Sequence, residues 1–267
     1  MGCALIRSFA FVALMPALIF GVQTASADEY YRGSLKDGPV VAQGYNWSGF
    51  YGGVNAGYTW NNWDWPSLNP YVAPPKPCGD CGPPNQNLSG AMLGGTVGYN
   101  HQIDRFVIGV EGDFNFANIS DSQRDGNYLV ETSKIEHFAT IRARAGLLLT
   151  PALLAYATGG VAFQDLEYGE SCPSDASAVT AGWCRSVANG GHGPYSLSKS
   201  QWNTGYVVGG GLEWMIAERV SLKVEGLYAD FGTNDYQLGL MADGKPLPKK
   251  SIENSETMLK VGVNYHF

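Results

Sequence analysis

Charged residues, long apolar runs and basic clusters are all scarce in this 267-residue sequence. Charged side chains make up only 15% of the chain, and the net charge is −7 without any lysine- or arginine-rich block, which argues against a nucleic-acid-binding protein. No run of 18 or more apolar residues occurs, so we expect no ordinary transmembrane helix. Hydrophobic content of 45% with 12% aromatics is too high for a wholly disordered chain.

Glycine is abundant instead. It accounts for 35 of the 267 residues. This share is nearly twice the usual share of about 7%. The glycines follow no G-X-Y period, which excludes a collagen. A glycine- and aromatic-rich chain of this length is typical of an all-β protein, either a secreted sandwich or a barrel in a membrane.

The N-terminus has the features of a secretory signal peptide over residues 1–27. Arg7 supplies a positive charge, Phe9–Val22 is apolar, and Ala25-Ser26-Ala27 is a small-residue cleavage site. The apolar stretch is too short to cross about 30 Å of hydrocarbon comfortably as a helix. We therefore expect residues 28–46 to form a short periplasmic leader and residues 47–267 to form the β-barrel domain.

Alternation with a period of two dominates the rest of the chain. In Phe50–Trp60 the even positions are mainly apolar or aromatic, and the odd positions are mainly small or polar. The segment Leu153–Phe163 is apolar on both faces, so its orientation stays unassigned. The eight predicted strands cover residues 50–60, 91–100, 106–115, 139–147, 153–163, 205–214, 220–228 and 258–267.

The connections between these strands alternate in length. Three are short, at residues 100–105, 148–152 and 215–219. Four are long, at about 61–88, 117–134, 164–201 and 232–254. Short turns on one side and long loops on the other are typical of an eight-stranded antiparallel up-and-down transmembrane β-barrel with four extracellular loops.

Aromatic residues concentrate at the two ends of the predicted strands, where amphipathic rings favour the membrane interface. A secreted β-sandwich would also alternate, but it gives no reason for two aromatic bands or for long loops on one side. At the short-turn ends lie Phe50, Tyr99, Phe106, Trp214, Tyr265 and Phe267, and at the long-loop ends lie Tyr58, Trp60, Phe114, Phe116, Tyr206 and Tyr228.

The inward face of the predicted barrel carries four acids and four bases. With eight strands, a barrel interior is just wide enough to be filled by side chains. An unpaired charge there would be costly, so the balance predicts ion pairs that plug the lumen. The inward glycines leave open a narrow channel for small solutes as the alternative. The charged residues are Glu111, Asp113, Arg142, Arg144, Glu213, Lys223, Glu225 and Lys260.

No constellation in the sequence predicts an enzyme, a metal site or a cofactor. None of the four histidines lies in a compact serine–histidine arrangement on a lipid-facing rim, and His266 is expected to point inward. The motif Cys78-Gly-Asp-Cys81 could belong to a redox or zinc site. In this proline-rich, exported setting we favour two loop-stapling disulfides, Cys78–Cys81 and Cys172–Cys184.

Several motifs resemble those of small OmpA-like barrels, and more closely those of the outer-membrane surface-antigen or porin-family proteins of alpha-proteobacteria. The resemblance covers nearly all of residues 45–267. The motifs that carry it are Tyr45-Asn46-Trp47-Ser48-Gly49-Phe50-Tyr51-Gly52-Gly53, Gly109-Val110-Glu111-Gly112-Asp113-Phe114, Ala155-Tyr156-Ala157-Thr158-Gly159-Gly160 and Val261-Gly262-Val263-Asn264-Tyr265-His266-Phe267.

This resemblance implies a surface protein of the Gram-negative outer membrane that contacts membrane lipid and lipopolysaccharide. We expect a monomer without nucleic-acid partners, and possible contact with a host or matrix ligand through the loops. No peptidoglycan-binding domain is expected after the eighth strand. The alternating C-terminal residues are similar to the signal read by the barrel-assembly machinery; they are Leu259, Val261, Val263, Tyr265 and Phe267.

Overall fold

The structure is a computed structural model that describes residues 45–62, 88–124, 129–172 and 184–267. The predicted signal peptide and most of the predicted leader lie outside these residues, as do Cys78 and Cys81. Among the described residues, no helix has both the length and the apolar character needed to span a membrane.

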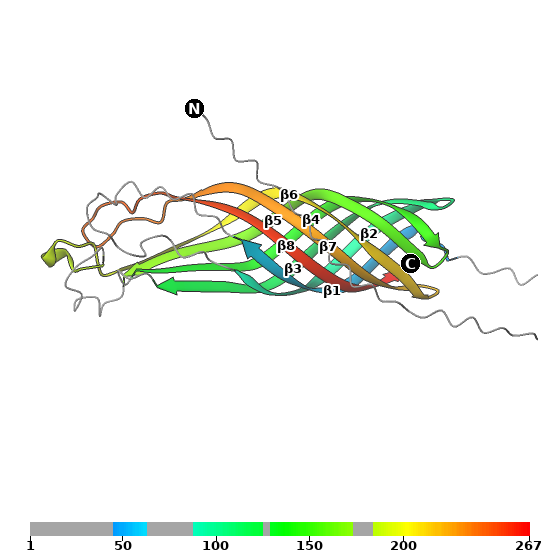
Figure 1. The fold of residues 1–267 in the computed structure, drawn as a ribbon, viewed down its shortest axis with the longest axis horizontal. Helices are drawn as coiled ribbons and strands as arrows, with labels where there is room; N and C mark the ends of the chain where they lie inside the picture. Colours follow the sequence, from blue (N-terminus) through cyan, green and yellow to red (C-terminus); the bar gives the residue numbers. More distant parts are fainter. Residues whose placement is uncertain (1–44, 63–87, 125–128, 173–183) are drawn as a thin grey trace, which may run out of the picture. The chain divides into compact units, whose positions relative to one another are not determined.

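Eight strands form one closed antiparallel barrel, in which each strand pairs with its neighbours in the sequence and β1 pairs with β8 (Figure 1). The predicted fold class is confirmed. The strands are β1 (Gly49–Asn62), β2 (Ser89–Ile103), β3 (Phe106–Arg124), β4 (Val130–Thr150), β5 (Leu153–Cys172), β6 (Tyr195–Ala217), β7 (Val220–Tyr236) and β8 (Lys250–His266), and the 3₁₀ turn η2 (Val187–Asn189) precedes β6.

The connections at one end of the barrel are tight turns. Asp104 and Arg105 join β2 to β3, and Asp104 has a φ of 52°, a left-handed conformation that aspartate tolerates better than most residues. Two-residue connections also join β4 to β5 and β6 to β7. Such turns fix the register of the strand pairs on either side.

At the other end, the predicted loop boundaries are wrong, because the strands continue well into three of the four ranges. The range 117–134 is mostly strand, since β3 extends to Arg124 and β4 begins at Val130. The ranges 164–201 and 232–254 likewise include the ends of β5, β6, β7 and β8. Apolar alternation marks only the part of a strand that faces lipid, whereas backbone pairing continues beyond it in water.

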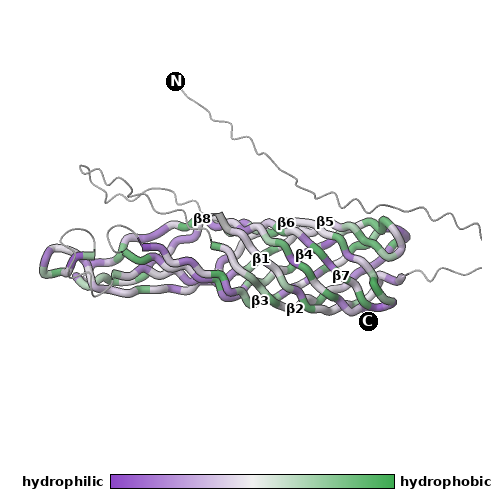
Figure 2. Tube along the Cα trace, turned by 60° about the horizontal axis from the view of Figure 1, so that its bottom comes forward, coloured by the Kyte–Doolittle hydropathy of each residue, from purple (hydrophilic) through white to green (hydrophobic). Residues whose placement is uncertain are grey.

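The length of β4 shows how far the sheet reaches beyond a membrane. Its 21 residues, at about 3.3 Å each, span roughly 70 Å, or about 50 Å along the axis at a tilt near 45°. The apolar band of an outer-membrane barrel is only about 25 Å tall. In Figure 2 the strands at the far end from the C-terminus are accordingly more hydrophilic than those near it.

The outer face of the barrel is apolar in its membrane-spanning part, and side chains there alternate with buried ones along each strand. In β2, for example, Leu93 and Val97 are exposed whereas Thr96 and Asn100 are buried. All twelve predicted interface aromatics are exposed on this face, namely Phe50, Tyr58, Trp60, Tyr99, Phe106, Phe114, Phe116, Tyr206, Trp214, Tyr228, Tyr265 and Phe267.

The orientation of β5 is settled by burial. Leu154, Tyr156 and Ala162 point into the barrel, whereas Ala157 and Val161 are exposed. This strand is apolar on both faces because its inward residues belong to apolar layers of the interior.

The interior is filled in layers that can be followed along β4 from the short turns outward. Leu148 belongs to an apolar cluster closed by Trp47, and Arg144 and Arg142 come next. Phe138 and Ile135 then belong to two further apolar clusters. A layer of buried charge therefore lies between apolar layers.

Candidate functional site: the charged lumen

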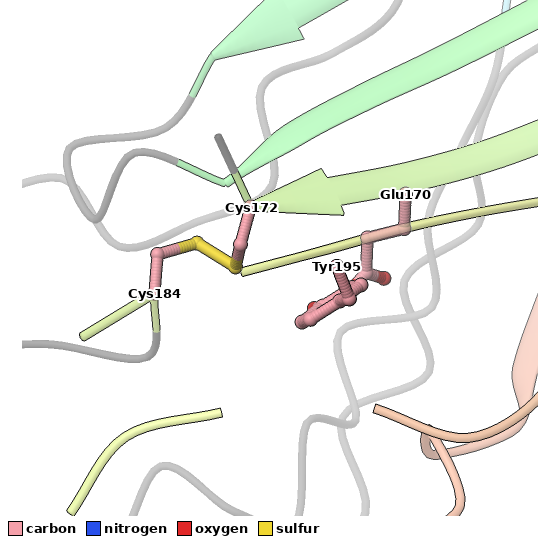
Figure 3. The surroundings of a disulfide bond; sticks show 4 residues. All are labelled: Glu170, Cys172, Cys184 and Tyr195. Carbon is pink, nitrogen blue, oxygen red and sulfur yellow. A yellow bond between two sulfur atoms is a disulfide. The ribbon is translucent and has the colours of Figure 1, made fainter. Parts of the chain in front are cut away.

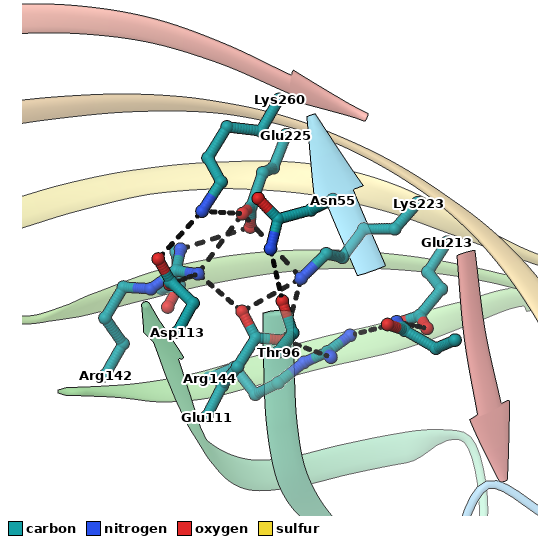
Figure 4. A network of polar contacts seen from close by, with 12 residues as sticks. Asn55, Thr96, Glu111, Asp113, Arg142, Arg144, Glu213, Lys223, Glu225 and Lys260 are labelled. Atoms are coloured by element: carbon teal, nitrogen blue, oxygen red, sulfur yellow. Dashed lines mark hydrogen bonds and ion pairs between the residues drawn. The ribbon is translucent and has the colours of Figure 1, made fainter. Parts of the chain in front are cut away.

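All eight charged residues predicted to face the lumen are buried, and each is at most 5% exposed. They come from five strands, so the closed sheet brings together groups that are up to 149 positions apart, from Glu111 to Lys260. Figure 4 shows them as one network of polar contacts. Four of them are acids and four are bases, as the sequence pattern indicates.

Arg142 on β4 is the centre of the network. Its Nη2 atom lies 2.5 Å from Glu111 Oε1 and 2.9 Å from Asp113 Oδ2, and its Nη1 atom lies 3.1 Å from Glu225 Oε2. A guanidinium group has five donors in a rigid plane, which suits it to bridge several carboxylates. Arg142 therefore holds acids of β3 and β7 together.

The remaining bases extend this network across the barrel. Arg144 Nη2 lies 2.6 Å from Glu213 Oε2, Lys223 Nζ lies 2.9 Å from Glu111 Oε2, and Lys260 Nζ lies 2.8 Å from Asp113 Oδ1. These contacts join β4 to β6, β7 to β3 and β8 to β3. Because each of these three ion pairs links non-adjacent strands, the side chains occupy the lumen and do not simply line its wall.

Two tyrosines in the network were missed by the sequence reasoning. Tyr51 donates its hydroxyl to Glu111 Oε2 (2.8 Å) and accepts from Arg144 Nη1 (2.9 Å). Tyr156 donates to Glu225 Oε2 (3.1 Å), and its ring lies 4.1 Å from the Arg144 guanidinium carbon. An aromatic at an inward position among small residues was the available signal for Tyr51, whereas Tyr156 lay in the unassigned fifth segment.

Glycine makes room for these inward side chains. A Cβ on Gly98 would lie 2.3 Å from the ring of Tyr51, and a Cβ on Gly94 would lie 2.5 Å from Asn115 Oδ1. The inward side chain of one strand thus lies flat over a glycine of the next. This explains part of the glycine excess as a packing requirement of a narrow barrel.

The short-turn end is closed by Trp47, which is fully buried. Its indole nitrogen donates to the carbonyl oxygen of Pro151 (3.1 Å), and its ring meets the edge of His266 at a centroid distance of 5.7 Å. His266 points inward as predicted, with Nε2 3.0 Å from the Ser221 hydroxyl and 3.7 Å from Glu213 Oε1.

Glu256 on β8 is a further inward acid that the sequence reasoning did not include. Its side chain is fully buried; among the described residues neither carboxylate oxygen has a well-formed hydrogen bond, and the polar side chain that faces it is Thr59. Buried polar groups normally bind protein partners or ordered water. The predicted balance of four against four therefore describes the central network but not the whole lumen.

The extracellular extension has a core of its own. Cys172 and Cys184 form a disulfide with a sulfur–sulfur distance of 2.00 Å, which is the second of the two predicted pairs. Figure 3 shows it beside Tyr195, whose hydroxyl donates to Glu170 Oε1 (2.7 Å). The disulfide packs in one apolar cluster with Tyr195, Met241 and Leu247.

The residues predicted to form the assembly signal lie on the outer face of β8 and at the chain end beside it. All are exposed, and they alternate with buried residues. They are Leu259, Val261, Val263, Tyr265 and Phe267.

Comparison with known proteins agrees with this architecture. The outer membrane protein beta-barrel domain family matches residues 14–267. The chain belongs to this family. It is 28% identical over 263 residues to a 31 kDa outer-membrane immunogenic protein of Brucella melitensis, covering 94% of this chain and 96% of that protein.

Two further similarities were found. A 22 kDa outer membrane protein of Rhizobium leguminosarum bv. viciae is 28% identical over 177 residues, covering 66% of each chain. The solved structure of the outer membrane protein OprG from Pseudomonas aeruginosa is also similar. The matched region covers 84% of this chain and 98% of the OprG chain, with 12% sequence identity and a TM-score of 0.45. The barrel is thus an outer-membrane protein of a Gram-negative bacterium, similar to immunogenic outer-membrane proteins.

Proposed function

We propose that this outer-membrane barrel is a closed, non-enzymatic anchor that supports the envelope and presents an extracellular surface for contact with other molecules. The observation that carries the proposal is the set of ion pairs that cross the lumen, from Arg142 to Glu225, Lys223 to Glu111 and Lys260 to Asp113. A solute would have to break these buried pairs to pass.

The apolar layers add to this closure. Trp47 and its neighbours fill the short-turn end, and Phe138 with Phe231 and Met258 fills the barrel beyond the charged layer. Opening a path would expose apolar side chains and separate charges at the same time. We therefore favour a plugged lumen over a pore.

The extension beyond the membrane supports the second part of the proposal. Strands β4, β5 and β6 continue far past the outer aromatic residues, and the disulfide and its apolar cluster hold the tip. We propose that the loops on this extension contact a host or matrix ligand. Outer-membrane lipid and lipopolysaccharide would surround a monomeric barrel that the assembly machinery inserts through its C-terminal residues.

A narrow channel for small solutes is the second candidate function. Several buried polar atoms on the β8, β1, β2 and β3 side of the lumen have no well-formed hydrogen bond to the residues that the structure describes, which favours water there. These atoms belong to Asn55, Asn100, Asn115, Glu256 and Asn264.

Liposome swelling distinguishes the two candidates. Liposomes that contain the refolded protein should swell no faster in small sugars than protein-free liposomes, with a known porin as the positive control. Sugar-dependent swelling would establish the channel and refute the plug.

The surface role is tested separately on cells. The connection between β1 and β2, or that between β5 and β6, is replaced by a short turn, and attachment to host cells or matrix is measured. We expect at least one replacement to reduce attachment while leaving the barrel in the outer membrane. Unchanged attachment in both would remove the loop-contact proposal.

A further inference from the structure

A group of three metal-ligating side chains lies on the outer face of the barrel, away from the lumen. Glu136, His137 and Asp165 each offer one ligand atom, and these atoms all lie within 4.8 Å of one another. The side chain of Glu136 is 46% exposed, whereas those of His137 and Asp165 are 30% and 17% exposed. The group is therefore accessible from outside but partly enclosed.

An irregularity in β4 creates this arrangement. The pairing of β4 with β5 shifts between Ile135 and His137, so Glu136 is an extra residue without a partner in the register. Without the shift, neighbouring residues of a strand would point to opposite faces. Here Ile135 and Phe138 are both buried, while Glu136 and His137 lie together on the outside.

Neighbouring strands hold the histidine and the aspartate in place. His137 lies directly opposite Asp165 in the register, with Phe116 on the other side of the histidine and Trp202 beyond the aspartate. The His137 ring lies 5.7 Å from that of Phe116 and 6.3 Å from that of Trp202. Phe116 is among the exposed aromatics at the long-loop ends, so the group lies at the outer membrane interface.

The spacing of the histidine and aspartate atoms also suits a metal ion. His137 Nδ1 and Asp165 Oδ2 form a contact of 3.4 Å, which is long for a hydrogen bond from nitrogen to oxygen, usually 2.7–3.2 Å. Two tetrahedral ligands, each about 2.0–2.1 Å from a zinc ion, are about 3.3 Å apart. A metal ion between these two atoms would thus need little movement of the backbone.

The surroundings resemble the outer shell of a metal site. Ser200 donates its hydroxyl to Asp165 Oδ1, which orients the carboxylate and leaves Oδ2 toward the histidine. Hydrogen bonds to ligating carboxylates commonly fix their orientation in this way. The Lys134 ammonium group would compete with a metal ion for Glu136, because Lys134 Nζ lies 2.5 Å from Glu136 Oε1.

We propose that Glu136, His137 and Asp165 bind a divalent transition-metal ion of the zinc class at the outer rim of the barrel. One imidazole nitrogen with two carboxylate oxygens suits zinc better than calcium or magnesium, which prefer oxygen ligands alone. Three protein ligands leave a fourth position open toward the exterior.

The test is calorimetric titration of Zn²⁺ into tag-free refolded protein in detergent micelles, with heat-modifiable gel mobility as the folding check on every variant. We expect one site per chain, and at least a tenfold loss of affinity in His137→Ala and in Asp165→Asn. Lys134→Ala should bind Zn²⁺ more tightly, because it frees Glu136.

His192→Ala is the matched control, since His192 also faces a carboxylate, with Nδ1 2.8 Å from Asp243 Oδ2 at the extracellular tip. This variant should bind as the wild type does. Equal affinity in wild type and His137→Ala, or loss of binding in His192→Ala instead, would overturn the proposal and leave adventitious surface binding only.

Discussion

Lys223 on β7 and Glu111 on β3 meet across the lumen from opposite walls of the barrel, with Nζ 2.9 Å from Oε2. In a ring of eight strands, β3 and β7 are as far apart as two strands can be. Glu111 also receives hydrogen bonds from Arg142, Arg144 and Tyr51. One carboxylate thereby links four side chains that come from three other strands.

Removing Arg142 should strongly destabilise the barrel. In Arg142→Met, three buried acids lose a shared partner, and breaking a buried ion pair in this way costs about 3–5 kcal/mol. The free energy of unfolding is measured by urea titration of the refolded protein in lipid vesicles. Lys245→Met is the control, because the Lys245 side chain is 69% exposed. This substitution should change the free energy of unfolding by no more than about 0.5 kcal/mol. Equal stability of Arg142→Met and wild type would contradict the network.

Two glycines of β2 should respond differently to alanine. In Gly98→Ala the new methyl group meets the Tyr51 ring, and overpacking of this kind costs about 1–3 kcal/mol. In Gly95→Ala the nearest atom is a carbonyl oxygen at 3.7 Å, so stability should hardly change. The same urea titration measures both. A larger decrease in the free energy of unfolding in Gly95→Ala than in Gly98→Ala would refute the packing role of glycine.

Much of the barrel could be predicted from the sequence because lipid imposes a simple pattern. Each membrane-facing position must be apolar, so period-two alternation gives the number of strands and their faces. The same alternation identifies Glu111 and Arg142 as inward, and burial of charge requires opposite partners.

Other features had no such signal. The strand extensions carry polar residues on their outer face, as loops do, so the end of β5 at Cys172 could not be located. The inward orientation of Tyr156 could not be predicted, because β5 is apolar on both faces. Which base meets which acid depends on the register and shear of the closed barrel, as the pairing of Arg144 with Glu213 shows.

Asp235, on the extracellular part of β7, should titrate below its ordinary range. A hydrogen bond from Lys249 lowers the pKa of this carboxyl from 3.8, and Ser251 adds to the effect. Both partners favour the charged form, so their contribution to stability is present above about pH 4 and is lost as the pH falls through the lowered pKa.

Carboxyl-detected NMR of the refolded protein measures this pKa directly. Lys249→Ala should raise it toward 3.8. Lys250→Ala should leave it unchanged, because Lys250 Nζ lies against Glu131, 3.0 Å from its Oε1. An Asp235 pKa that is the same in wild type and Lys249→Ala would show that the ion pair does not form in solution.

The disulfide should stabilise the extracellular tip rather than the barrel. Cys172→Ser removes a cross-link over a sequence separation of 12, in a cluster that contains Tyr195 and Met241. Limited proteolysis of vesicle-embedded protein should cleave the segment around residues 184–194 faster in the variant, while heat-modifiable mobility stays unchanged. Equal cleavage rates in the two proteins would show that the apolar cluster holds the tip without the cross-link.

Single-channel conductance in planar bilayers tests the closed lumen most directly. Pure refolded wild-type protein should give no reproducible current steps, whereas a refolded Arg142→Ala/Lys223→Ala variant, which removes two of the bases that fill the lumen, should conduct. Reproducible steps from the wild-type protein would contradict the account, because the buried ion pairs would then not close the barrel.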